Sequence, residues 1–438
     1  MKPNIIFYFS DQQRADSAGC YGQKLPVTPN LDAMAEEGTL FENAFTCQPV
    51  CGPMRACLQS GVYASQIVCY RKDIALPTDC KTIAHYMKDA GYDTEYIGKC
   101  HLASDKNHRL ATKPTPEERR GGYDYWRAAD ILEFTSHGYN GYVFDENCNR
   151  LDFKGYRADK INDFAVEYVK KQHDKPFFMF VSQLEPHHQN DRGHFEGPKE
   201  KIENYRNYPL PEDLTFLKGN YGEEYPDYLA AINSLDDNVG RLVKTLKEKG
   251  IYDNTVIVYT SDHGCHFKTR NAEYKRSCHD SCIHTPLVFG GGAISKQEKT
   301  AVLASLIDIP PTLLSLADIT VPESYSGNIL PVKEENAPER DCVFVQISES
   351  QVGRAVRTKD WKYSARAMIP GMICYSSTVY FDDFLYDLKN DPHEKTNLVN
   401  NKKYKAVIDE MRSLLSREMV KAGEKKPMLL KPLFSKKY

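Results

Sequence analysis

Hydrophobic residues gather in four short runs within the first 260 residues, and longer segments with a helical pattern of apolar positions separate them. The runs are Ile5–Phe9, Thr94–Ile97, Phe177–Val181 and Thr255–Tyr259. Each run is nearly continuous, which is typical of strands that are covered on both faces. The pattern therefore predicts four buried strands of a sheet layered between helices.

The segments between these runs are predicted to be helices. Thr28 is a good N-cap, Pro29 suits the first helical position, and Gly38 ends the helix. Three more segments have one apolar face and precede a turn and a strand: Lys81–Ala90, Asp159–Lys171 and Tyr228–Lys249. This alternation of helices and strands indicates the α/β class.

The character of the sequence changes after a charged, proline-containing segment at 334–340, which is typical of a linker. Strand-like runs follow at Val343–Ile347, Gly353–Arg357 and Lys362–Ser364, and a helical pattern occupies Tyr404–Ala422. These elements predict a smaller antiparallel sheet with a terminal helix.

Together the patterns predict an α/β fold with a large mixed, mostly parallel central sheet sandwiched by helices. We expect a catalytic α/β domain over residues 1–335 and a C-terminal α+β subdomain over residues 336–438. A chain of 438 residues is long enough to bury the cores of two such domains.

The composition is that of an ordinary soluble globular protein, with 27% charged and 41% hydrophobic residues. The net charge of −3, without a basic run, argues against a nucleic-acid-binding protein. The first apolar run is too short for a signal peptide or a membrane span. We therefore expect a cytoplasmic protein, or a periplasmic one if a leader has been trimmed.

The 13 cysteines are an odd and high number. Without an export signal, most of them are expected to be free thiols rather than disulfides. Cys265, Cys278 and Cys282 form a loose cluster that could ligate zinc. Their spacing does not match paired Cys-x-x-Cys ligands, so a structural zinc site is not favoured.

Each of the four predicted strands runs into residues that titrate or bind metals. In strand order these are Asp11 and Gln12; Lys99 and His101; His187 and His188; Asp262 and His263. Ligands of open α/β sheets bind beyond the carboxyl ends of the strands. A single polar loop would mean little, but four such loops predict one polar site at one edge of the sheet.

Asp11 and Asp262 would place two carboxylates at this edge, where they would repel each other if left unpaired. A divalent cation removes this repulsion, with a carbonyl oxygen of Gln12 and a nitrogen of His263 as further ligands. An oxygen-rich set favours calcium or magnesium, and the single histidine leaves manganese or zinc open.

The segment Cys51-Gly52-Pro53-Met54-Arg55, followed by Gly61, places a cysteine where a helix is expected to begin. Pro53 suits the first turn, and Arg55 adds a cation about one turn away. A helix start and a nearby cation both lower a thiol pKa and bind anions. An unreactive buried cysteine is the alternative, but the strand-end residues favour a nucleophile.

A metal, Arg55 and lysines at one site describe a receptor for a compact oxyanion ester. Lys99 and Lys275 would bind the nonbridging oxygens, and His187 would protonate the departing oxygen. For either lysine alone, a solvated surface side chain is the alternative interpretation.

These motifs resemble the type I sulfatases of the alkaline-phosphatase superfamily. Cys51, Pro53 and Arg55 match the family's Cys-x-Pro-x-Arg signature, whose cysteine is oxidised after synthesis to formylglycine. Further matches follow in order along most of the chain: Asn4–Phe7 with Asp11, Thr28–Asp32, Gly98–Leu102, Pro186-His187, Asp262–Gly264, and Leu385–Leu388 with Asp391, Pro392 and Glu394. This ordered set is far more specific than any one motif.

The resemblance implies how the nucleophile and the metal are held. Cys51, as formylglycine, is the nucleophile, and Arg55 orients and stabilises it. Residue 51 shares the metal, usually calcium in this family, with four other ligands: Asp11, Gln12, Asp262 and His263.

The resemblance also implies how the ester is bound and cleaved. Lys99 and Lys275 bind the sulfate, and Lys275 is placed by the match of Ile283–Leu287 to a later family segment. His187 is the general acid for the leaving alcohol, and His101 is the base that restores the aldehyde. A formylglycine-generating maturase is therefore an expected partner.

Gln12 departs from the family pattern, because many members have a second aspartate there. With Asp11, Arg14 and Asp16 it also resembles the phosphonate monoester and phosphodiester hydrolases of the same superfamily. Cleavage of such esters is therefore an alternative function.

Our leading hypothesis is a sulfuric ester hydrolase that acts on a sulfated sugar or small oligosaccharide. The polar segment 187–194 is rich in groups that bind hydroxyls or carboxylates. We expect His188 and Arg192 to contact the sugar, with Arg192 pairing with a uronic-acid carboxylate. A polar surface loop is the alternative interpretation of this segment.

Two further hypotheses remain if Cys51 is not modified. The chain would then be a non-catalytic, metal-dependent binder of anions or glycans. Alternatively it would be a cysteine enzyme whose thiolate works with His101 or His187.

Overall fold

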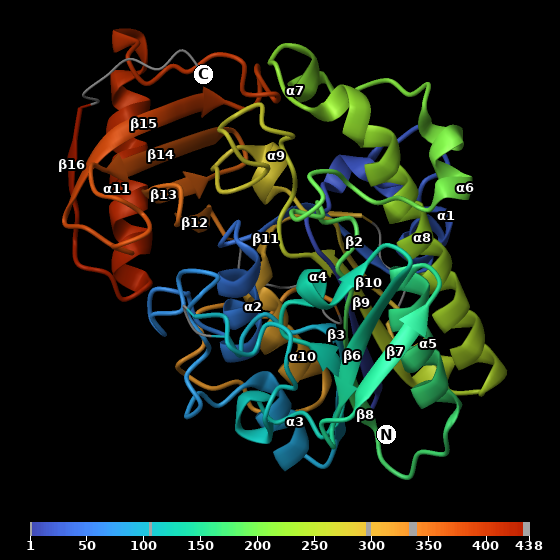
Figure 1. The fold of residues 1–438 in the computed structure, drawn as a ribbon. Helices are drawn as coiled ribbons and strands as arrows, with labels where there is room; N and C mark the ends of the chain where they lie inside the picture. Colours follow the sequence, from blue (N-terminus) through green and yellow to red (C-terminus); the bar gives the residue numbers. More distant parts are fainter. Residues whose placement is uncertain (1, 105–106, 295–298, 333–339, 432–438) are drawn as a thin grey trace.

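Two β-sheets and the helices around them form the part of the chain that the computed structural model describes, residues 2–104, 107–294, 299–332 and 340–431. Figure 1 shows the larger sheet at the centre of the molecule, with the smaller sheet beside it in orange and red. No helix in the described part of the chain is both long and apolar enough to span a membrane.

The central sheet contains eleven strands among the described residues. Ten of them follow one path: β11 (Thr300–Ser305), β2 (Thr39–Phe45), β10 (Leu287–Gly290), β9 (Thr255–Ser261), β1 (Asn4–Ser10), β8 (Phe177–Ser182), β3 (Asp93–Lys99), β4 (Tyr125–Ala129), β6 (Asn140–Asp145) and β5 (Ser136–His137). β7 (Arg150–Lys154) pairs with β6. The large mixed sheet predicted from the sequence is confirmed. Five of the pairings between its described strands are parallel, and five are antiparallel, so it is less parallel than predicted.

The four predicted strands are β1, β3, β8 and β9, and they are neighbours in the middle of this sheet. Their pairings are all parallel, and the register aligns Ser10 with Ser261 and Gly98 with Ser182. The residues that follow these strands therefore meet at one edge, as the sequence predicts. β10 lies antiparallel to both β9 and β2, which the sequence patterns did not reveal.

Helices cover both faces of the central sheet because its strands are apolar on both sides. Ile5, Phe7 and Phe9 of β1 lie in one core, and Ile6 and Tyr8 lie in the other. The first core includes residues of α2 (Cys51–Ser60), α3 (Ile83–Asp89) and α10 (Ile309–Leu316). The second includes residues of α1 (Pro29–Glu37), α5 (Arg157–Lys170) and α8 (Tyr221–Glu248), to the right in Figure 1.

The predicted helices are present with small shifts in their ends. α8 begins seven residues before the predicted Tyr228. α1 begins at Pro29 as predicted, but Thr28 makes no capping hydrogen bond with its side chain. Its hydroxyl instead accepts from the backbone N–H of Gly19 and donates to Asp32. Four further helices are single turns: α4 (Leu132–Thr135), α6 (Lys199–Ile202), α7 (Glu212–Thr215) and α9 (Asp280–Ile283).

The second sheet follows the order β12 (Val343–Ile347), β13 (Val352–Arg357), β14 (Trp361–Ala367), β15 (Val379–Asp387) and β16 (Met428–Leu430). Its pairings are antiparallel except that of β15 with β16. α11 (Lys405–Lys421) packs against this sheet. The predicted antiparallel sheet and terminal helix are thus confirmed. The predicted linker lies outside the described residues up to residue 339, and the domain boundary at 335 stays a prediction.

Candidate active site

Cys51 is the first residue of α2, as the sequence predicts. Val50 before it is extended, with φ −147° and ψ 131°, and Pro53 lies in the first turn. Gly61 ends the helix with φ 72°, and a Cβ at that position would lie 2.5 Å from the ring of Tyr325. The motif therefore fixes both ends of the helix and presents Cys51 at its N-terminus.

A cavity of about 520 Å³ lies at the carboxyl ends of the central strands. Seven of the residues that the sequence singles out line it: Gln12, Cys51, Lys99, His101, His187, His188 and Lys275. The single polar site predicted from the four strand ends is therefore a cavity of the folded chain.

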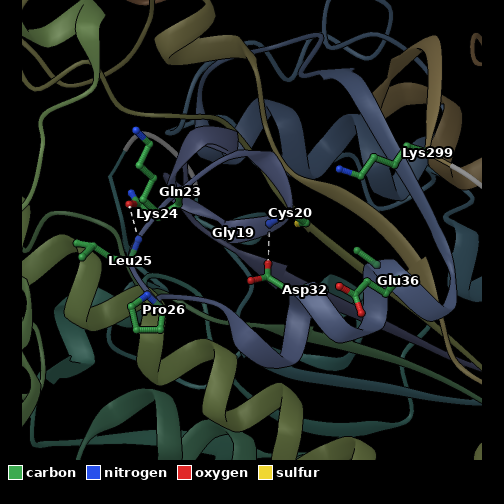
Figure 2. Close-up of a pocket in the computed structure, with 10 residues that line it drawn as sticks. Gly19, Cys20, Gln23, Lys24, Leu25, Pro26, Asp32, Glu36 and Lys299 are labelled. Atoms are coloured by element: carbon green, nitrogen blue, oxygen red, sulfur yellow. Dashed lines mark hydrogen bonds between the residues drawn. The ribbon is translucent and has the colours of Figure 1, made fainter.

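A larger hollow of about 890 Å³ lies elsewhere, beside α1 (Figure 2). Lys24, Asp32, Glu36 and Lys299 line it, and Asp32 is turned toward the backbone N–H of Cys20 at 2.7 Å. Burial and the neighbouring Asp32 raise the pKa of the Cys20 thiol, so this thiol is not activated. The smaller cavity at the strand ends is therefore the candidate active site.

Two buried carboxylates at the base of the cavity each keep one oxygen without a hydrogen-bond partner in the structure. Asp11 Oδ2 accepts from Lys99 Nζ at 2.7 Å and from Arg55 Nη2 at 3.0 Å, while Oδ1 has no partner. Asp262 Oδ1 accepts from the N–H groups of Gln12 and His263, while Oδ2 has no partner. Buried carboxylate oxygens without partners are costly, so the pair suits a cation.

His263 is oriented as a metal ligand would be. Its Nδ1 lies 2.9 Å from the carbonyl oxygen of Gly264 and donates to it, so the lone pair of the neutral ring is on Nε2. Without an ion, Nε2 lies 3.2 Å from Lys275 Nζ. Nε2 lies 3.4 Å from Asp262 Oδ2 and 3.9 Å from Asp11 Oδ1. Ligand atoms of Asp11, Cys51, Asp262 and His263 all lie within 4.8 Å of one another.

The two carboxylates have opposite pKa shifts. Burial and the neighbouring Asp11 raise the pKa of Asp262 to about 7. Burial and Cys51 also act to raise the pKa of Asp11, but the cations Lys99, His187 and Lys275 hold it well below its usual range. Asp11 is therefore ionised at neutral pH, and Asp262 is the carboxylate whose charge still needs a counter-ion.

Gln12 lies at the cavity in the left-handed backbone region, with φ 71°. Its amide nitrogen donates to Cys265 Sγ at 3.3 Å, and its amide oxygen accepts from the N–H of His188 at 3.4 Å. The metal-ligand role predicted for Gln12 stays a prediction, because its amide has these other partners.

Cys51 lies among cationic and imidazole groups. Its Sγ is 2.6 Å from Lys275 Nζ, 3.6 Å from His263 Nε2 and 3.9 Å from His187 Nε2. Burial alone would raise the thiol pKa, but Lys275, Lys99 and hydrogen bonds from the histidines lower it well below its usual value. Position 51 is therefore the most strongly activated thiol that the structure describes.

The hydrogen bonds of the Arg55 guanidinium go to groups other than Cys51. This guanidinium binds the Asp11 carboxylate, the hydroxyl of Ser182 and, at 2.9 Å, the carbonyl oxygen of Lys99. The predicted role of orienting the nucleophile stays a prediction, because these hydrogen bonds of the guanidinium go to residues other than Cys51. Arg55 instead fixes the end of β3 and the candidate ligand Asp11.

His101 lies in the left-handed region, with φ 56°, just after β3. Its backbone N–H donates to the carbonyl oxygen of Asp130 at 2.7 Å. The Asp130 carboxylate in turn accepts the three following N–H groups, those of Leu102, Ala103 and Ser104. This buried aspartate, which no motif marks, holds the loop that carries His101.

Glu133 is a further residue that sequence reasoning missed. It lines the cavity from α4, and its Oε2 lies 3.4 Å from His187 Nδ1. Burial acts to raise the pKa of Glu133, but His187, Lys99, His101 and a hydrogen bond from Asn190 lower it. A charged carboxylate at this distance favours a proton on Nδ1, although the two groups form no hydrogen bond in the structure. The other ring nitrogen, Nε2, lies 3.9 Å from Cys51 Sγ.

His188 and Arg192, the two residues predicted to contact a sugar, lie in different places relative to the cavity. His188 lines the cavity but is buried in its wall, stacked on Tyr274 with ring centroids 4.4 Å apart. Arg192 does not line the cavity, and its guanidinium pairs with Glu196 at 3.1 Å. The sugar contact predicted for Arg192 stays a prediction, and in this structure an acidic side chain four residues later binds its guanidinium at the surface.

The cysteine cluster has other partners than zinc. Cys265 accepts from Gln12, and Cys278 Sγ lies 3.5 Å from the hydroxyl of Ser364. Within the described residues, the groups whose geometry could hold a metal ion include none of Cys265, Cys278 and Cys282.

A family model for sulfatases matches residues 3–319, and one for the C-terminal part of N-sulphoglucosamine sulphohydrolase matches residues 272–421. The chain belongs to the sulfatase family, within the alkaline-phosphatase superfamily. It is a sulfuric ester hydrolase. The resemblance seen in the sequence is thus confirmed.

Named sulfatases match almost the whole chain. An ulvan-active sulfatase of Formosa agariphila is 31% identical over 447 residues, 97% of this chain and 82% of its own length. An N-acetylglucosamine-6-O-sulfatase of Bacteroides thetaiotaomicron is 26% identical over 94% of this chain and 86% of its own. A structure solved as a sulfatase candidate from Bacteroides fragilis has a TM-score of 0.81 at 24% identity, over 97% and 96% of the two chains.

Proposed function

We propose that this sulfatase hydrolyses sulfate monoesters of a sugar or small oligosaccharide, with Cys51 converted to formylglycine and a divalent cation, calcium in the first place. The observation that supports it most is one cavity whose lining includes Cys51, Lys99, Lys275, His101 and His187. Beside Cys51 lie two carboxylates, Asp11 and Asp262, each with one unpartnered oxygen. That set provides a nucleophile position, an anion site, a proton donor and a cation site together.

The residues fit a divalent cation. Asp11 Oδ1, Asp262 Oδ2 and His263 Nε2 would bind it together with residue 51, and Gln12 is the further predicted ligand. Oxygen donors predominate, which favours calcium, while the histidine leaves magnesium or manganese possible. When bound, the cation would balance the charge of the two aspartates and polarise the sulfate oxygens.

Position 51 suits the modification. It lies at a helix start and within 2.6 Å of the Lys275 ammonium, both of which favour developing negative charge there. Formylglycine would supply a hydrate oxygen as the nucleophile. Its formation requires a maturase, which is the partner we propose for the newly made chain.

In ester cleavage, four residues of the chain would then have separate roles. Lys99 and Lys275 bind the nonbridging sulfate oxygens as fixed cations. His187 donates the proton from Nε2 to the leaving alcohol, while Glu133 holds the proton on Nδ1. His101 lies on the wall of the same cavity and accepts a proton when the nucleophile is regenerated.

His187 needs the substrate to become an acid. Burial and the Lys275 and Lys99 charges lower its pKa, and Asp11 only partly offsets them. A bound sulfate adds negative charge beside these lysines and so favours the protonated imidazole. Proton donation is thereby coupled to occupation of the anion site.

The rim of the cavity suits a sugar. Phe134 lines it, and 49% of its surface is exposed. An exposed aromatic ring at a cavity mouth is a platform for the apolar face of a pyranose, and the neighbouring Asn190 offers an amide to hydroxyls. One relative of this chain is named for a sulfated N-acetylglucosamine, which supports the same substrate class.

The function is tested with protein made together with a formylglycine-generating enzyme. Anion release is measured from the sulfate, phosphate and methylphosphonate esters of 4-nitrophenol, and then from a panel of sulfated mono- and disaccharides. We expect sulfate release to be fastest and to disappear in Cys51→Ala. Faster phosphonate cleavage would instead assign the chain to phosphonate hydrolysis.

Thiol chemistry distinguishes the proposed function from the two hypotheses that need an unmodified Cys51, a thiolate enzyme and a non-catalytic binder. Converted protein should resist iodoacetamide at position 51 and react there with carbonyl reagents. Hydrolysis that iodoacetamide abolishes would point to a plain thiolate enzyme. A Cys51 that stays a thiol when the maturase is present, together with tight sugar-sulfate binding and no hydrolysis, would point to a binder.

A further inference from the structure

Five basic side chains line the candidate active-site cavity: Lys72, Lys99, Lys268, Lys275 and Arg276. Three of them have negative partners of their own. Lys99 pairs with Asp11, Lys275 contacts Cys51, and Arg276 pairs with Glu349 and Glu273. Lys99 and Lys275 are also the two residues proposed to bind the sulfate that is cleaved.

Lys268 differs from these three because the described residues place no carboxylate within ion-pair distance of it. Glu224 in the same wall accepts a hydrogen bond from the Tyr274 hydroxyl at 2.9 Å. Burial raises the pKa of Glu224, and the charge of Lys268 only partly offsets this effect. Lys268 therefore lines the cavity without an ion pair of its own among the described residues.

The side chain of Lys268 is nevertheless held in place. Its Nζ lies 4.8 Å above the ring of Tyr274, and Tyr274 is stacked on His188 in the cavity wall. A cation over an aromatic face is attracted to it and is restricted in its motion. This arrangement separates Lys268 from a lysine that moves freely in solvent.

The backbone that carries Lys268 also has an unusual conformation. Phe267 and Lys268 both lie in the left-handed region, with φ 48° and 62°. Residues other than glycine seldom adopt this region, and they persist there where the surroundings hold them. Phe267 is fully buried against Phe195 and Tyr228, so it anchors the turn that presents Lys268.

We propose that the sugar sulfates taken by this cavity carry a second anionic group, and that Lys268 binds that group beside His188 and Tyr274. This inference rests on the proposed function. A neutral sugar ring gains nothing from a fixed cation without an ion pair, whereas a carboxylate or a second sulfate gains a charge-assisted hydrogen bond. Lys268 is thus a specificity-determining residue.

Binding is measured by calorimetry on protein produced without the maturase, whose Cys51 stays a thiol and does not turn substrate over. One arm compares the 2-, 4- and 6-monosulfates of methyl galactoside with its disulfates. The other compares a sulfated disaccharide that contains a uronate with the methyl ester of that uronate. In each arm the wild type is set against Lys268→Ala.

We expect at least one doubly anionic ligand to bind wild type about tenfold more tightly than its singly anionic partner, and Lys268→Ala to remove that difference. The arm that responds identifies a second sulfate or a carboxylate. Equal affinities in both arms, or a preference that survives Lys268→Ala, would overturn the proposal.

Lys247→Ala is the matched control, because Lys247 also lies over a tyrosine ring, 4.6 Å from that of Tyr252, but does not line the cavity. It should keep the wild-type preference. Hydrolysis of 4-nitrophenyl sulfate by converted wild-type protein is measured in parallel. Its absence would count against the proposed function, whereas its presence with no anion preference would count against Lys268 alone.

Discussion

At the scale of single residues, the chemistry of the site depends on which charges lie next to which. Lys275 Nζ lies 2.6 Å from Cys51 Sγ and is the largest influence that lowers the pKa of that thiol. The thiolate forms above the thiol pKa, so lowering the pKa extends reactivity to lower pH. The pH dependence of Cys51 alkylation therefore reports directly on this contact.

In protein made without the maturase, Lys275→Met should move Cys51 alkylation to higher pH. At pH 7 we expect the rate of iodoacetamide labelling at Cys51, followed by peptide mass, to fall by about tenfold or more. Lys247→Met serves as the control for loss of a lysine elsewhere. Superimposable pH profiles for wild type and Lys275→Met would contradict the account.

A second residue-scale prediction concerns the proton donor. His187→Ala should lower kcat on a sugar sulfate by about 10²–10⁴, because an alkoxide leaves poorly without a proton. The loss on 4-nitrophenyl sulfate should be much smaller, since a nitrophenolate leaves without help. Each substrate thus controls for the other, and equal losses on both would remove His187 from the role of general acid.

At the scale of elements, the sequence patterns predicted what is buried and continuous and missed what is short or half-exposed. β1, β3, β8 and β9 are apolar on both faces, so their pattern is unambiguous. Edge strands such as β7, in which exposed and buried positions are mixed, carry no such pattern. The direction of β10 depends on long-range pairing that no local pattern encodes.

The glycine before Lys99 shows how an element positions the site. Gly98 has φ 99°, and a Cβ there would lie 1.9 Å from the carbonyl oxygen of Ser182 on the neighbouring strand β8. Gly98→Ala should therefore force β3 away from β8 and lower the free energy of unfolding by about 3 kcal/mol or more.

Gly250→Ala is its control, because Gly250 has φ 68° but open space around the added Cβ. It carries the strain of the left-handed backbone alone, about 1 kcal/mol. Urea unfolding measures both variants. Similar losses for the two would show that the close approach of β3 and β8 does not matter.

Functional residues, like the strands, were predicted where the sequence has a clear pattern and were missed where it has none. Residues in ordered motifs, such as Cys51, Lys99 and Asp262, were predicted and lie together in the cavity or at its base. Glu133 and Phe134 on the single-turn helix α4 were not, because one turn has no pattern of its own. Arg192 forms a local pair with Glu196, and its predicted contact with a sugar stays a prediction.

At the scale of the whole molecule, the central strands bring Asp11 and Asp262 together from positions 251 residues apart, and a cation would link them. Asp262 has its pKa raised to about 7 by burial and by Asp11, so in metal-free protein the ionised form is disfavoured. When folding raises the pKa of a carboxyl, the folded protein loses stability as the pH rises from the ordinary carboxyl pKa through pH 7. A bound cation would reverse that loss.

Calcium should therefore raise Tm more at pH 8 than at pH 5.5, by a few degrees when it is present at about 100 times its Kd. Asp262→Asn should remove the calcium effect and, in the presence of chelator at pH 8, should raise Tm above that of wild type. Thermal unfolding followed by fluorescence measures both. A calcium effect that does not depend on pH, or that survives in Asp262→Asn, would contradict the proposed ligand set.

The most direct test of the central claim relates sulfate release to the state of residue 51. Protein is produced with graded amounts of the maturase, the converted fraction is read from peptide mass, and sulfate release from 4-nitrophenyl sulfate is measured on each sample. The account predicts a rate that rises in proportion to the formylglycine fraction and falls to zero without it. A rate that does not depend on conversion would show that hydrolysis does not use this position as proposed.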